Sequence, residues 1–231
     1  MRASIAITLV GLLGCGDDGG SPAVDASTQT TTRTVTGTTS DIGLSGRTPL
    51  AGVTVEAYQE GGTTPVATTT SAADGTYSLT ITTEGVLDGY LLGRIAGKKD
   101  TYLYPAGPLT ADIDNATILM LTQGLFDTAS TLAQGGQTPG MGFIGVQVYT
   151  PANTAVAGVT LSSSPAGTVR YNGSNGLPTA NGTMTLADGL GYIFNVAPGE
   201  VTISATGGGM TFKSHEVNAR ADQVTTTLIT P

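Results

Sequence analysis

The sequence predicts an all-β chain of two antiparallel β-sandwiches joined by one amphipathic helix. Its 231 residues suit two domains of about 100 residues each. Glycine is abundant at 34 residues, only 11% of the residues are charged and tryptophan is absent, a turn-rich composition that favours strands. Apolar and polar residues also alternate in short runs, as expected for strands with one buried face.

The charge balance bears on possible partners. Nine basic residues stand against 17 acidic ones, which gives a net charge of −8, and the longest basic block is the pair Lys98 and Lys99. Nucleic acid and anionic lipid surfaces would repel such a chain. No nucleic-acid partner is therefore expected.

The N-terminus has the pattern of an export signal. Arg2 precedes the apolar run Ala3–Leu13, which is too short to span a bilayer, and the run leads into Leu-Leu-Gly-Cys at 12–15. This ending resembles the lipobox of bacterial lipoproteins. The resemblance implies that residues 1–14 are a signal peptide and that Cys15 is lipidated. Several acyl chains on one residue would anchor the chain durably in a membrane.

Three further points concern this anchor. Gly16, and not aspartate, follows the cysteine, so the same resemblance favours the outer over the inner membrane of the cell envelope. Cys15 is the only cysteine, and an ordinary secretory signal with an incidental cysteine, or a buried thiol, is the alternative. Residues 15–33 are small, polar and acidic, which predicts a flexible tether.

Two stretches of the chain share a local pattern. Pro-Leu-Ala-Gly-Val-Thr-Val at 49–55 corresponds to Ala-Val-Ala-Gly-Val-Thr-Leu at 155–161, and an Asp-Gly turn follows each, at Asp74 and Asp188. A repeated supersecondary unit explains this correspondence. Alternating runs predict strands at 34–37, 53–58, 77–81, 143–149, 159–161, 192–194, 201–205 and 224–229.

The order of these motifs in residues 35–79, from Val-x-Gly through Pro-Leu-Ala-Gly-Val to Asp-Gly-x-Tyr-x-Leu, resembles the carboxypeptidase regulatory-like domain. The second unit is similar up to its Pro198-Gly199 turn, whereas Thr83–Gly85 replaces that turn in the first. The resemblance implies two transthyretin-like or immunoglobulin-like β-sandwiches, at residues 34–110 and 141–231. It concerns turns and core pattern, so it implies a fold and no particular activity.

A helical connector is predicted at residues 111–140. Five apolar residues recur at the spacing of one helical face: Ile118, Leu121, Leu125, Ala129 and Leu132. This spacing predicts a helix from about Asn115 to Gln134, with its apolar stripe packed on a sandwich. Asp114 or Asn115 would cap its first turn and Gly135-Gly136 would end it. A mobile amphipathic linker is the alternative.

No catalytic centre, metal site or cofactor is expected. His215 is the only histidine, so neither the zinc site of carboxypeptidases nor the iron site of sandwich dioxygenases can be assembled. We expect His215 to face solvent on a strand. The acidic run at 112–115 is interpreted as a helix cap and not as a calcium loop, and Gly207–Gly209 as a hairpin tip.

One stretch gathers aromatic and basic side chains: Tyr90, Arg94, Lys98, Lys99, Tyr102 and Tyr104. Tyr102 and Tyr104 would project from one face of a strand, where they could stack on sugar rings. The alternative is that these tyrosines close the base of the sandwich. A second-unit loop is a weaker candidate of the same sort, with Arg170, Tyr171, Asn172 and Asn175.

Together these observations predict a non-enzymatic, membrane-anchored surface lipoprotein that serves as a structural or protein-contact module. Its expected partners are the membrane, through the lipid, and an envelope protein or polysaccharide. The alternative is a lipoprotein that binds carbohydrate or cell wall through Tyr90, Arg94, Tyr102 and Tyr104.

Overall fold

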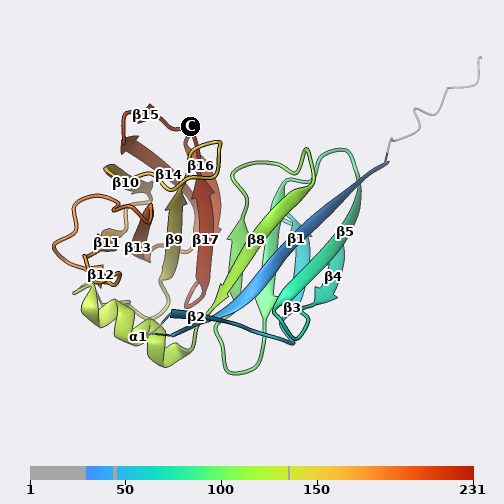
Figure 1. The fold of residues 1–231 in the computed structure, drawn as a ribbon, viewed down its shortest axis with the longest axis horizontal. Coiled ribbons are helices and arrows are strands. Elements are labelled where there is room, and N and C mark those ends of the chain that lie inside the picture. Colours follow the sequence, from blue (N-terminus) through green and yellow to red (C-terminus); the bar gives the residue numbers. More distant parts are fainter. Residues whose placement is uncertain (1–29, 44–45, 135) are drawn as a thin grey trace, which may run out of the picture.

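The computed structural model describes residues 30–43, 46–134 and 136–231. The predicted signal peptide, Cys15 and most of the predicted tether lie outside the described residues. The all-β prediction is confirmed, because the described residues form 17 strands and one helix, arranged as two β-sandwiches side by side (Figure 1).

The first sandwich holds strands β1 (Thr30–Gly43), β2 (Gly46–Pro49), β3 (Thr54–Gln59), β4 (Ala67–Thr70), β5 (Thr76–Glu84), β6 (Gly89–Arg94), β7 (Thr101–Tyr104) and β8 (Ile113–Met120). One of its layers is β5-β1-β8, with β2 paired to the end of β1, and the other is β4-β3-β6-β7. Strand β1 pairs antiparallel with β5 and parallel with β8.

Helix α1 (Gln123–Leu132) leads into the second sandwich, which holds β9 (Gly142–Val148), β10 (Val159–Ser164), β11 (Thr168–Asn172), β12 (Pro178–Thr179), β13 (Leu190–Val196), β14 (Gly199–Gly207), β15 (Met210–Thr211), β16 (His215–Ala219) and β17 (Val224–Ile229). One layer is β12-β11-β13-β9-β17 and the other is built on β14, which pairs with β10, β15 and β16. Strand β9 pairs antiparallel with β13 and parallel with β17, as β1 does with β5 and β8.

The repeated sequence pattern makes the same contacts in both sandwiches. The Ser71 hydroxyl accepts from the Val53 amide at 3.0 Å and donates to a backbone carbonyl at 2.9 Å, and Thr185 does the same with Val159 at 3.0 Å and a carbonyl at 2.7 Å. The two Asp-Gly turns also match.

Glycine is required at both of these turns. Gly75 and Gly189 have φ of +79° and +67°, and a Cβ on either would lie 2.6 Å from a backbone carbonyl oxygen, that of Thr39 or Val148. The Asp-Gly pairs therefore mark equivalent points of two repeated units.

The two sandwiches share one sheet. Strand β17 pairs in parallel with β9 of its own sandwich and with β7 of the first, which produces a nine-stranded sheet in the order β12-β11-β13-β9-β17-β7-β6-β3-β4. The pairing covers an edge strand of each sandwich. These parallel pairs were not part of the antiparallel prediction.

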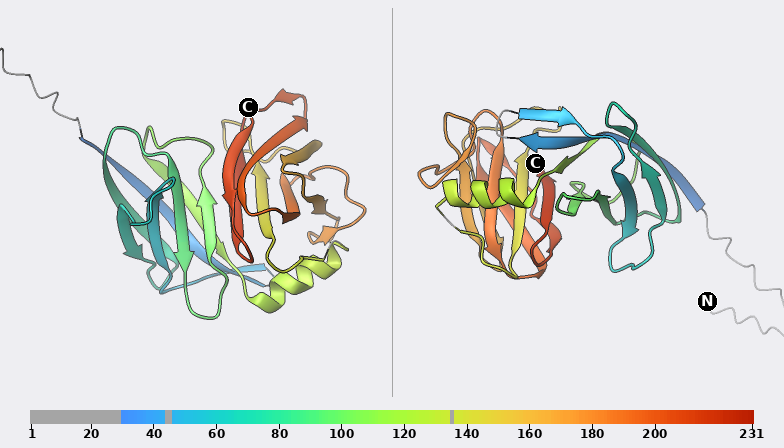
Figure 2. Two further views of the ribbon diagram at one scale, coloured as in Figure 1. Left: turned by 180° about the vertical axis from the view of Figure 1, so that it is seen from behind. Right: turned by 90° about the horizontal axis from the view of Figure 1, so that it is seen from below.

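The remaining layers cover opposite faces of this common sheet. On β7, Leu103 packs in the core of the first sandwich, whereas Tyr102 and Tyr104 belong to the core of the second sandwich. The layer β5-β1-β8 therefore covers one face of the common sheet near its β4 end. The layer built on β14 covers the opposite face near the β12 end. Figure 2 shows the resulting offset and the position of α1 across the end of the second sandwich.

The helix prediction is wrong for its first half. Residues 113–120 form β8, in which Ile118 and Met120 are fully buried, and the helix begins only after Thr122, whose side chain accepts from the Leu125 amide at 3.2 Å. Asp114 and Asn115 therefore do not cap it. Residues 113–120 form a strand because they pair with β1 and bury alternate side chains. This tertiary contact outweighs the local preference for a helix that the apolar spacing suggested.

The start of β1 and the role of the acidic run at 112–115 also differ from prediction. Strand β1 begins at Thr30, so residues 30–33 belong to the first sandwich and not to a tether. Asp112 accepts from the Thr34 amide at 2.9 Å and Asp114 accepts from the Thr36 hydroxyl at 2.9 Å. The acidic run at 112–115 therefore ties β8 to β1 instead of starting a helix.

Candidate functional site at the junction of the sandwiches

Four tyrosines form a cluster on the common sheet where the sandwiches meet. They are Tyr58 on β3, Tyr90 on β6, and Tyr102 and Tyr104 on β7. The Tyr90 ring centroid lies 5.4 Å from that of Tyr58, 5.6 Å from Tyr102 and 5.2 Å from Tyr104. These are the separations of favourable aromatic pairs.

Arg220, in the turn between β16 and β17, closes this cluster from the second sandwich. Its guanidinium carbon lies 3.9 Å from the Tyr102 ring centroid and 4.5 Å from that of Tyr90. Its Nη1 donates to the Tyr104 hydroxyl at 3.1 Å and to the Asn218 carbonyl at 2.9 Å. The arginine therefore combines cation–π contacts with charge-assisted hydrogen bonds.

The structure brings three of the predicted ligand-binding residues together but covers two of them. Tyr102 and Tyr104 are 9% and 5% exposed, and Tyr90 is partly buried beside them. Arg94 pairs with Glu56 at 3.1 Å and with Asp100 at 3.0 Å. Since sugar stacking needs open ring faces, this arrangement favours the alternative that the tyrosines are packing residues, although they pack against the second sandwich.

Burial also affects the protonation of Tyr104 in this cluster. It raises the pKa of the Tyr104 phenol well above its ordinary value, and the positive charge and hydrogen bond of Arg220 only partly oppose this effect. The neutral phenol can therefore accept from Arg220 while it donates to Glu60 at 3.0 Å. Arg220 itself was not singled out in the sequence, because nothing near it in the chain is aromatic.

A small acidic pocket lies next to the cluster. It has a volume of about 120 Å³ and is lined by Glu60, Asp88, Glu200 and Glu216 around His215. His215 is partly buried, its Nε2 has no hydrogen-bond partner among the described residues, and burial lowers its pKa despite the charge of Asp88. The expectation that His215 faces solvent is therefore wrong. Within residues 30–43, 46–134 and 136–231, no group of three or more His, Cys, Asp or Glu could hold a metal ion.

A much larger apolar groove lies on the opposite face of the common sheet. It has a volume of about 590 Å³, and its floor is formed by β6, β7, β17, β9 and β13. Its walls are β8, the β1–β2 hairpin, helix α1 and the loop before β12. In Figure 1, α1 and β2 lie together at the lower end of the second sandwich. The predicted helical stripe, Leu121 to Leu132, faces this groove.

The groove has a polar end. Asn172, Tyr192 and Arg47 all line it. Burial and the charge of Asp188 raise the pKa of the Tyr192 phenol, whereas hydrogen bonding with Asn172 and the charge of Arg47 act in the opposite direction. Asn172, Asp188 and Arg47 therefore all lie near Tyr192. Asn172 belongs to the stretch that the sequence offered as a loop and a weaker binding candidate, but Arg170, Tyr171 and Asn172 lie on strand β11.

No family model matches the chain, and neither does any curated protein, so the carboxypeptidase regulatory-like resemblance stays a prediction. In the described part of the chain, no helix is both long enough and apolar enough to cross a membrane.

Several solved structures are similar over most of the chain. The shaft pilin SpaA of Lactobacillus rhamnosus GG is 15% identical over 87% of this chain and 98% of its own, with a TM-score of 0.26. GBS52, the minor pilin of Streptococcus agalactiae, is 12% identical over 86% and 94%, with a TM-score of 0.29. The Bacillus anthracis TIE protein is 11% identical over 86% of this chain and 34% of its own, with a TM-score of 0.27.

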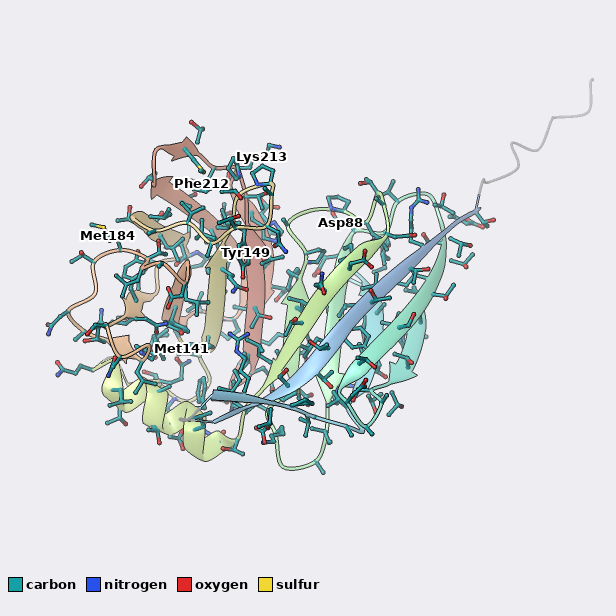
Figure 3. All side chains as sticks on the ribbon, viewed as in Figure 1. Asp88, Met141, Tyr149, Met184, Phe212 and Lys213 are labelled. Atoms are coloured by element: carbon teal, nitrogen blue, oxygen red, sulfur yellow. The ribbon has the colours of Figure 1, made fainter. Side chains whose placement is uncertain are left out.

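The Arg220 contacts give a testable prediction for stability. Replacing Arg220 by alanine should lower the free energy of unfolding by about 2 kcal/mol, because its contacts with the rings of Tyr90, Tyr102 and Tyr104 and its hydrogen bond to the Tyr104 hydroxyl are lost at a partly buried site. Urea unfolding followed by circular dichroism measures this change. Lys213, which is exposed at the end of the second sandwich remote from α1 (Figure 3), provides the control, and Lys213→Ala should change stability by less than about 0.5 kcal/mol. Equal effects of the two substitutions would refute the role of Arg220.

Proposed function

We propose that the chain is a non-enzymatic structural module of the bacterial cell surface, in which two β-sandwiches act as one rigid body that makes protein contacts. The observation that carries this proposal is the position of β17, which pairs with β9 on one side and β7 on the other. Two domains joined only by a linker are expected to move relative to each other. A shared sheet removes that freedom, because bending at the junction would break backbone hydrogen bonds.

The side chains at the junction support the same proposal. Arg220 and the four tyrosines lie directly beside the β7–β17 pair, so the rings and the backbone ladder restrict the same motion. The hydroxyls of Thr226 and Thr227 donate to the carbonyls of Tyr102 and Tyr104 at 3.3 and 3.2 Å. A body held in this way would serve as a spacer or a scaffold of fixed shape.

Surface attachment through Cys15 is the second part of the proposal. It rests on the lipobox-like sequence and on the place where the described chain starts. Thr30, the first described residue, begins β1 at the outer side of the first sandwich, away from the second (Figure 2). A lipid on Cys15 would therefore hold the first sandwich nearer the membrane and present the second outward, with outer-membrane placement favoured by Gly16.

Lipidation can be tested directly in a bacterial host. The chain should partition with membranes, whereas Cys15→Ser should be released, because several acyl chains are needed for durable anchoring. Ser21→Ala, a substitution in the same segment, should leave the partition unchanged. Mass spectrometry should find acyl groups on an N-terminal Cys15. An unmodified peptide that still contains Met1 to Cys15 would contradict the anchor.

The contact function can be tested separately with the purified chain. We expect retention on immobilised envelope proteins and none on peptidoglycan or envelope polysaccharide, because Tyr102 and Tyr104 are covered. Retention by polysaccharide that Tyr90→Ala abolishes would overturn this expectation in favour of carbohydrate binding. Lys213→Ala serves as the matched surface variant.

A further inference from the structure

Helix α1 presents apolar side chains on more of its surface than the fold needs. Phe126 and Ala133 are buried against the second sandwich and fix the helix in place. Leu125, Ala129 and Leu132 line the groove together with Phe126, and Leu132 remains 44% exposed. A helix that packs by one stripe normally turns polar residues outward, so the second stripe is unexplained by the fold.

The floor of the groove continues this apolar surface. Leu190 on β13 and Leu228 on β17 are partly exposed and line the groove. The groove volume, about 590 Å³, falls within the range of small-molecule sites, which are mostly apolar with a few convergent polar groups. Its size and shape therefore suit one small amphiphile.

The polar end supplies one buried acceptor without a partner and one exposed positive charge. Asn172 is 3% exposed, and its Nδ2 donates to Asp188 at 2.6 Å. Its Oδ1 is buried and has no hydrogen-bond partner among the described residues. A buried acceptor left unpaired is costly, so it points to a missing donor. Arg47 is exposed at the same end and forms no ion pair with any described residue.

We propose that the groove binds a fatty acid that carries a hydroxyl group near its carboxylate. The hydrocarbon chain would lie along Leu125, Ala129 and Leu132, the carboxylate would pair with Arg47, and the hydroxyl would donate to Asn172 Oδ1. Arg47 is the only basic residue among those that line the groove in the described chain and favours an anionic head at the polar end, whereas Asp114, the one acidic residue among them, lies on β8 and accepts from the Thr36 hydroxyl. This binding is independent of the spacer function proposed above.

Calorimetric titration of the purified full chain with 3-hydroxydodecanoate tests the proposal. We expect saturable binding at one site, and affinity should rise about fourfold for each methylene added between the 8-carbon and 12-carbon homologues. Dodecanoate, which lacks the hydroxyl, should bind about tenfold more weakly because Asn172 Oδ1 stays unpaired. Absence of binding at millimolar ligand, or equal affinity for the two acids, would overturn the proposal.

Two variants with matched controls locate the site. Arg47→Ala should weaken binding of 3-hydroxydodecanoate about tenfold or more, and Leu132→Glu should do so by placing a negative charge on the apolar wall. Lys213→Ala and Met210→Glu are the controls, since Lys213 is exposed and Met210, at 40% exposure, resembles Leu132 without lining the groove. All four positions are exposed, so the variants should fold. Binding that is unchanged in Arg47→Ala and Leu132→Glu, or weakened equally in the controls, would place the ligand elsewhere and refute the assignment.

Discussion

The parallel pairing of β7 with β17 is the interaction on which the rest of the structure depends. Each of these strands is an edge of its own sandwich, and an unpaired edge exposes backbone donors and acceptors. Their register runs from Val224 opposite Thr101 to Thr227 opposite Tyr104. Thr225 and Thr227 are buried at the seam, and their hydroxyls donate to backbone carbonyls at 3.2 Å in both cases. At the β7–β17 pairing, the backbone groups and the hydroxyls of these two threonines therefore have hydrogen-bond partners.

The two candidate surfaces follow from this pairing. The two outer layers lie on opposite faces of the common sheet. Each face of this sheet is therefore covered by an outer layer over only part of its width, and other parts of the chain must cover the rest. On one face, Arg220 and the tyrosines fill the gap. On the other, α1 and the β1–β2 hairpin cover it only in part, and the groove remains. The same geometry thus produces a closed junction and an open groove.

Local patterns in the sequence were sufficient for the parts of the fold that depend on neighbouring residues. The repeat around Gly52 and Gly158, the Asp-Gly turns and the alternating strands could be predicted because turn chemistry and side-chain period are local. The start of the helix could not be predicted. The spacing of Ile118, Leu121 and Leu125 fits a helix, whereas Ile118 and Met120 fit a strand, and only the long-range pairing of β8 with β1 decides between them.

The candidate site was predicted only in part for a similar reason. Tyr102 and Tyr104 were expected to share a strand face, and they do, but their cover comes from Arg220, more than 100 positions along the chain. Asn172 gave only a weak signal in the sequence, because its unpaired oxygen is a property of the folded chain. No local pattern indicates that β17 would join two sandwiches.

The central claim, that both sandwiches form one cooperative body, is tested most directly by native-state hydrogen exchange of the β3 and β9 backbone amides. Both strands lie within the common sheet, one in each sandwich. If the account is correct, the slowest amides in β3 and in β9 should exchange with the same free energy and the same denaturant dependence, through unfolding of the whole chain. Amides of β3 that open at a lower free energy than those of β9, or the reverse, would show that the sandwiches unfold independently and would contradict it.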